Sequence, residues 1–172
     1  GSVIVLTGDG EFQEGQIFEA LQTVAHQKLN DLIVIMDHNK IQSSQYVKKI
    51  VDLLDLKRKI KSFGWHVERC DGHNFKKIDM TFKKISRIKN KPKFIIADTV
   101  KGKGVNFMEH TKVMKSNKYY NWHAGAPSEN NFQKAQSILL KKIELFQKKI
   151  KFKNLKITEI TSKEIDNNIE IH

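Results

Sequence analysis

Residues 3–10 read Val-Ile-Val-Leu-Thr-Gly-Asp-Gly, an apolar run that ends in a tight turn. The run is typical of a buried strand, and its glycines accept the backbone angles that a turn requires. From Glu11 onward, apolar residues recur at three- and four-residue steps, which predicts a helix with one apolar stripe. The stripe consists of Ile17, Phe18, Leu21, Val24, Ala25 and Leu29. Residues 32–36 are apolar again, so the chain opens with a β-α-β unit.

The same alternation continues along the chain. Residues 53–63 predict a helix that stops at Gly64, and residues 65–70 predict a strand. Residues 75–88 predict another helix and residues 94–97 another strand. Because the strands are apolar throughout, we expect a mostly parallel sheet covered on both faces, that is, a doubly wound α/β domain.

The second half of the chain has a weaker pattern. Residues 105–127 show no periodicity and are expected to form a long irregular loop, which in a compact domain is often functional. Residues 132–150 return to helical spacing, whereas residues 151–172 are polar and weakly patterned. We therefore expect one α/β domain over residues 1–150 and a polar tail or linker over residues 151–172.

Composition limits the class of protein. The 172 residues carry a net charge of +12, but almost all of the positive charge is lysine scattered along the chain. Base readout and bidentate phosphate recognition favour arginine, so we expect a solvated lysine-rich surface and no nucleic-acid partner. With no apolar stretch of membrane-spanning length and no signal peptide, we expect a cytoplasmic protein with no membrane partner. Cys70 is the only cysteine, which excludes an internal disulfide.

A candidate cofactor site follows the first two predicted strands. Gly8, Asp9 and Gly10 lie where the first strand ends and a helix begins, a position where free N–H groups favour a diphosphate. The second strand ends at Asn39, so the side chains of Asp9 and Asn39 should emerge at the same edge of the sheet. Both offer oxygen ligands to a hard cation such as Mg²⁺, which shares its remaining positions with phosphates and water.

Several segments carry a resemblance to a known family. Gly8-Asp9-Gly10, then 28 residues, then Asn39 is similar to the thiamine diphosphate fingerprint, and residues 8–20 look like its transketolase version. Further matches are Gly64-Trp65-His66-Val67 with Asp71-Gly72-His73, residues 99–105, Phe107-Met108-Glu109, Trp122-His123 and Ala126-Pro127. Together they cover residues 3–135 and most resemble the small N-terminal subunit of two-subunit transketolases, with the thiamine-diphosphate-binding fold.

The resemblance implies a role for particular residues. Asp9 and Asn39 would give side-chain oxygens to Mg²⁺, and Ile41 its backbone carbonyl. The glycines of the turn, Gly8 and Gly10, belong to the cofactor-binding set, and the Gly10 N–H would donate to the diphosphate. Glu14 matches a glutamate at the dimer interface that links two active sites. Lys101 should approach the cofactor, and His123 matches a histidine that contacts the diphosphate and the reacting carbon. Glu14 and His123 are thus the catalytic candidates.

The resemblance also has gaps. Ser43 stands where the family has a hydrophobic residue that packs on the thiazolium ring, so an isoleucine there would restore an apolar wall. The resemblance implies a segment before the first strand that this sequence does not contain, so we expect the domain to be truncated. The glutamate that protonates the aminopyrimidine comes from a second domain.

We therefore expect sugar-phosphate substrates, a homo- or hetero-oligomer and, as a partner, the complementary C-terminal subunit of a transketolase. Two alternatives stay open: a fragment similar to deoxyxylulose-phosphate synthase, and a non-catalytic scaffold or basic binding module.

Overall fold

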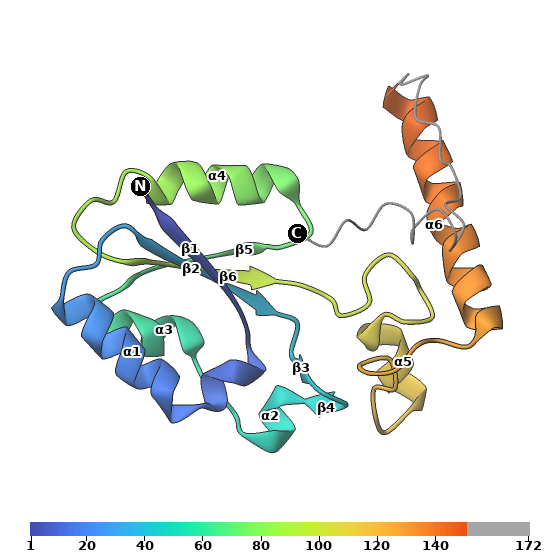
Figure 1. Ribbon diagram of the computed structural model, residues 1–172, viewed down its shortest axis with the longest axis horizontal. Coiled ribbons are helices and arrows are strands. Elements are labelled where there is room, and N and C mark those ends of the chain that lie inside the picture. Colours follow the sequence, from blue (N-terminus) through green and yellow to red (C-terminus); the bar gives the residue numbers. More distant parts are fainter. Residues whose placement is uncertain (151–172) are drawn as a thin grey trace, which may run out of the picture. The chain divides into compact units, whose positions relative to one another are not determined.

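A four-stranded parallel sheet forms the centre of residues 1–127, in the order β1-β2-β6-β5 (Figure 1). The computed structural model describes residues 1–150. The strands are β1 (Val3–Gly8), β2 (Leu32–His38), β5 (His66–Asp71) and β6 (Lys93–Asp98). Helices α1 (Gly15–His26) and α3 (Leu56–Ser62) cover one face, and α4 (Phe75–Ile85) covers the other. The predicted doubly wound parallel fold is confirmed.

The main core lies between the sheet and the face formed by α1 and α3. Phe12, Met36 and Phe94 are at most 1% exposed there, and the Phe12 ring packs edge-on against Phe94 at 5.4 Å. Leu21 of α1 and Ile60 of α3 complete the contact from the two helices. The continuous apolar strands and the apolar stripes of the helices thus meet in one cluster, as the sequence patterns predict.

The first helix begins later and ends earlier than its apolar stripe predicts. Gly10–Gln13 forms a short 3₁₀ turn that buries Phe12, and α1 starts only at Gly15. The helix ends at His26 because Lys28 adopts a left-handed φ of 53°. Leu29 therefore lies outside the helix.

Strand β1 is an edge strand, and it is unusually apolar for one. Val3, Ile4, Val5 and Leu6 are 43–73% exposed. Leu6 also borders a hollow of about 360 Å³ on the α4 face, beside Ile35, Phe82 and Ile95. An exposed apolar edge strand is a template for pairing with another strand.

Residues 99–127 are more ordered than the expected irregular loop. They contain helix α5 (His110–Ser116), and Tyr120 packs with Ile41 and Val113 in a second small core. Ile41 belongs to a hairpin that the sequence did not indicate, formed by β3 (Ile41–Gln42) and β4 (Gln45–Tyr46) and followed by α2 (Val47–Ile50).

Helix α6 (Glu129–Ile150) belongs to a second unit, which begins at Ser128. The expected tail or linker, 151–172, lies outside the described residues. Within residues 1–150, the helices are too short or too polar to cross a bilayer.

Candidate functional site

Asp9 is a buried carboxylate at the carboxyl edge of the sheet. Gly8 is paired in register with Asp37 of β2, so the chain leaves both strands at the same level, as expected. The Asp9 side chain reaches across to the end of β2, where its Oδ2 accepts the Lys40 N–H at 2.5 Å. Asp9 is 1% exposed, and burial raises its pKa, while the hydrogen bonds from the Lys40 and Gly10 N–H groups oppose that rise. A carboxylate in this state is stabilised by a nearby cation.

Asn39 has its amide orientation fixed by its neighbours. Its Oδ1 accepts the Ile41 N–H at 2.9 Å, and its Nδ2 donates to Asp37 Oδ2 at 2.9 Å. The other Asp37 oxygen accepts the Thr99 hydroxyl. Asp37 therefore holds the nitrogen of the amide and leaves the oxygen on the hairpin side, the arrangement that a ligand amide needs from its neighbours.

The hairpin brings Ile41 and Gln42 against the first turn. A Cβ on Gly10 would lie 2.9 Å from the Gln42 Cγ, so only glycine allows the hairpin to approach this closely. The Gln42 Oε1 is buried and has no hydrogen-bond partner among the described residues. An acceptor left without a partner beside Gly10 fits a site completed by a ligand. Ile41 itself is 3% exposed and anchored in the Tyr120 cluster.

The two glycines of the turn differ in what their N–H groups contact. The Gly8 N–H donates to the Glu11 carboxylate, which also accepts the Thr7 hydroxyl at 2.9 Å. The Gly10 N–H lies against the Asp9 carboxylate and opposes the rise in its pKa that burial causes. Gly8 therefore shapes the turn, and its N–H is already used within the chain.

Lys101 and His123 form a second part of the site. The Lys101 ammonium lies 2.9 Å from His123 Nδ1 and 5.6 Å from the centre of the Tyr120 ring. Burial lowers the pKa of Lys101, and the Asp37 and Asp9 carboxylates oppose that change. Their influence means that the lysine lies within electrostatic reach of the strand-end carboxylates.

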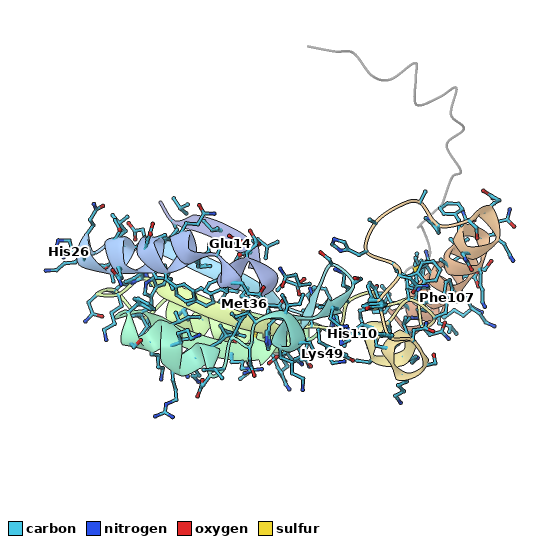
Figure 2. The ribbon with its side chains drawn as sticks, turned by 90° about the horizontal axis from the view of Figure 1, so that it is seen from below. Glu14, His26, Met36, Lys49, Phe107 and His110 are labelled. Carbon is cyan, nitrogen blue, oxygen red and sulfur yellow. The ribbon has the colours of Figure 1, made fainter. Side chains whose placement is uncertain are left out.

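Glu14 differs from the other predicted site residues because it is exposed. It precedes the first residue of α1 and projects from the surface (Figure 2). The structure thus brings Asp9, Asn39, Ile41 and Gly10 together, with Lys101 and His123 beside each other, and leaves Glu14 at the surface.

Ser43, at the tip of the hairpin, has a φ of 51°. This left-handed conformation is costly for any residue with a Cβ and most costly for a β-branched one. An isoleucine at this position would therefore strain the turn, whatever apolar contact it offered a ring.

An ion-pair cluster near the carboxyl ends of β2, β5 and β6 connects these three strands. Arg69 of β5 donates two hydrogen bonds to Asp98 of β6, at 2.6 and 2.7 Å, and His38 of β2 lies 2.8 Å from the same carboxylate. The Arg69 hydrogen bond holds the pKa of Asp98 down at about 2. The cluster fixes the strand ends that carry the site.

Four residues of this region were not recognised from the sequence: Asp37, Gln42, His110 and Tyr120. Within residues 1–150, no three histidine, cysteine or acidic side chains gather as a metal site. A cation here would depend on the Asp9 carboxylate together with amide and carbonyl oxygens, a set of oxygen donors that suits a hard ion such as Mg²⁺.

The family described as "Transketolase, thiamine diphosphate binding domain" matches residues 2–141. The chain belongs to this family. The predicted membership is confirmed.

The curated relatives include transketolase subunits. The chain is 33% identical over 144 residues to an apulose-4-phosphate transketolase subunit of Phocaeicola vulgatus, a match that covers 84% of the chain and 48% of that relative. It is 40% identical over 108 residues to the 6-deoxy-6-sulfo-D-fructose transketolase subunit SqwG of Clostridium sp. strain MSTE9, covering 63% of the chain and 39% of that relative. The chain thus spans less than half the length of each.

Among solved structures, transketolase from Campylobacter jejuni superposes with a TM-score of 0.60 at 21% identity. The superposition covers 88% of this chain and 26% of that one. At this identity the likeness concerns the fold, and it agrees with the parallel sheet described above.

Proposed function

We propose that this chain holds the diphosphate end of thiamine diphosphate through Mg²⁺, with Asp9, Asn39 and Ile41 as its protein ligands. The observation that carries the proposal is the buried Asp9 carboxylate, hydrogen-bonded to the residue that follows Asn39. Its desolvation is costly unless a cation compensates it. The Asn39 Oδ1 and the Ile41 carbonyl add neutral oxygens, and the diphosphate and water complete the shell of a small hard ion.

Lys101, His123 and Gly10 would contact the cofactor itself. The Lys101 ammonium is partly desolvated and offers a charge to a phosphate oxygen, while its neighbour His123 would orient the diphosphate and face the reacting carbon. Close packing of the hairpin on Gly10 supports a narrow cradle for the diphosphate. In that cradle the Gly10 N–H would exchange its present Asp9 contact for a phosphate oxygen.

The reaction we propose is transfer of a two-carbon ketol unit from a ketose phosphate to an aldose phosphate. Bound thiamine diphosphate would supply the electron sink for that chemistry. This chain would bind and orient the cofactor, and a complementary transketolase subunit would supply the groups that contact its pyrimidine ring. The names of the two subunit relatives support such a division. Exposed Glu14 would then lie at the interface between subunits.

A non-catalytic role is the second candidate, and Ser43 is the observation that favours it. A small polar residue in a left-handed turn offers no apolar contact to a thiazolium ring. In that case the fold would be kept and cofactor affinity lost.

A coupled assay of ketol transfer distinguishes the two. We expect no turnover from the purified chain alone and measurable turnover when it is co-expressed with a complementary subunit. The Asp9→Ala variant should lose that turnover, and Asp79→Ala, which removes an exposed carboxylate paired with Lys83 on α4, should retain it. Turnover by the chain alone would contradict the divided site. No turnover with any complement, together with no cofactor binding, would favour the non-catalytic role.

A further inference from the structure

His110 is a buried histidine that makes two hydrogen bonds with a single residue. It is 4% exposed and is the first residue of α5 (Figure 2). Its backbone N–H donates to the Lys101 carbonyl at 2.9 Å, and its ring Nδ1 accepts the Lys101 N–H at 3.1 Å. Both backbone polar groups of Lys101 are therefore held by His110.

The ring can accept this hydrogen bond only in one form. Because Nδ1 accepts, it carries no proton, so the neutral ring has its proton on Nε2. Burial, together with the ammonium groups of Lys40 and Lys101, lowers the pKa of His110, whereas the Glu109 carboxylate acts in the opposite direction. The Tyr46 ring of the hairpin packs edge-on to the imidazole at 6.3 Å. These neighbours favour the neutral acceptor.

Lys101 needs such support because its side chain is long. Holding a lysine in one rotamer costs conformational entropy, so the side chain reaches His123 reliably only from a fixed backbone. Tyr120 supports the other end: its ring lies below the ammonium, its N–H donates to the Ser44 carbonyl at 2.7 Å, and its hydroxyl donates to the Met108 carbonyl at 2.9 Å. His110 fixes the backbone and Tyr120 supports the charge.

We propose that His110 is a positioning residue for Lys101, whose backbone it fixes so that the ammonium lies against His123. His110 acts through Lys101. The consequence for cofactor binding rests on the function proposed above, whereas the hydrogen bond itself does not.

Two amide substitutions test whether an acceptor at the position of the His110 Nδ1 is required. In His110→Asn the side-chain oxygen stands as many bonds from Cβ as Nδ1 does, whereas in His110→Gln it stands one bond further. His110→Leu keeps similar bulk and removes the acceptor. Hydrogen exchange of the Lys101 amide in the full chain is the direct measurement.

We expect protection in the wild type and in His110→Asn, and exchange about tenfold faster in His110→Gln and His110→Leu, the effect of one lost hydrogen bond. His26→Leu, at the far end of α1, controls for the loss of a histidine (Figure 2). Equal protection in the Asn and Gln variants, or wild-type protection in the Leu variant, would overturn the proposal. The Asn and Gln pair keeps the test valid if the Leu variant does not fold.

Cofactor binding gives the second readout. Quenching of the fluorescence of Trp122, adjacent to His123, would follow titration with thiamine diphosphate and Mg²⁺ in the complex with a complementary subunit. We expect the Asn variant to bind like the wild type and the Gln and Leu variants to bind about tenfold more weakly. If the Gln and Leu variants exchange the Lys101 amide faster but bind thiamine diphosphate as tightly as the wild type, the role of His110 in cofactor binding would be overturned. A wild type that binds no cofactor would refute the proposed function, while the exchange pattern would still decide whether His110 positions Lys101.

Discussion

Gly102 follows Lys101, and its replacement by alanine should displace the loop that carries the lysine. Its φ is +78°, a left-handed conformation that favours glycine. A Cβ built at this position would lie 2.2 Å from the Met108 carbonyl oxygen and 3.0 Å from the Tyr120 hydroxyl. The first of these atoms is backbone, so the contact is relieved only if the loop moves.

The loss of stability in Gly102→Ala has two causes, and alanine substitutions at two other glycines distinguish them. A left-handed conformation costs an alanine about 1–2 kcal/mol, and forcing an extra carbon into a packed region costs about 1–3 kcal/mol. Gly102→Ala should therefore lower the free energy of unfolding by about 2–5 kcal/mol. Gly125 has a φ of +81° but open space around it, so Gly125→Ala carries only the first part. Gly15, at the start of α1, has neither constraint.

Urea denaturation, followed by circular dichroism, measures all three variants. We expect the largest loss of stability for Gly102→Ala, a smaller loss for Gly125→Ala and no loss for Gly15→Ala. A Gly102→Ala variant no less stable than Gly125→Ala would refute the packing of Met108 and Tyr120 around this loop.

Three other predictions concern the hairpin, the strand ends and the sheet edge. Ser43→Ile should lower the free energy of unfolding, because a left-handed turn costs a β-branched residue more than it costs serine, whereas Ser43→Gly, which removes the Cβ, should not; urea denaturation compares them. The pKa of Asp98 is lowered to about 2, so its ionised form should add on the order of 1 kcal/mol to the free energy of unfolding above pH 4, after allowance for solvent screening. This stabilisation should be lost as the pH falls towards 2 and the carboxylate is protonated in the folded state. The variant Arg69→Met should flatten that part of the stability profile, and an unchanged profile would contradict the assignment. Ile4→Lys on the exposed edge strand should reduce self-association in analytical ultracentrifugation, whereas Val51→Lys, at a similarly exposed site outside the sheet, should not.

The sheet and the strand-end part of the site could be predicted because both follow from regular patterns. Apolar strands that alternate with amphipathic helices specify a parallel sheet, and parallel strands place their carboxyl ends together. The expectation that Asp9 and Asn39 leave the sheet at one edge required nothing more, and the pairing of Gly8 with Asp37 confirms it.

The second part of the site could not be read from the sequence. The hairpin strands have two residues each, too short for a periodic pattern, and α5 has few apolar residues. The partner of His110 is a backbone amide nine residues earlier, which any residue type would supply. Similarly, the His73 ring accepts the Val100 N–H at 2.8 Å. Neither His73 nor His110 stands at a spacing from other residues that would indicate such a role. Contacts between side chains and backbone leave no signal in the sequence when they form through tertiary packing.

The most direct test of the account is calorimetric titration of thiamine diphosphate into the complex of this chain with a complementary subunit, with and without Mg²⁺. We predict that binding requires the divalent ion and is lost in Asp9→Ala, while Asp79→Ala binds like the wild type and all three proteins keep the same circular dichroism spectrum. Equal affinity of the wild type and Asp9→Ala for the cofactor, or binding that does not depend on Mg²⁺, would contradict the proposed metal site.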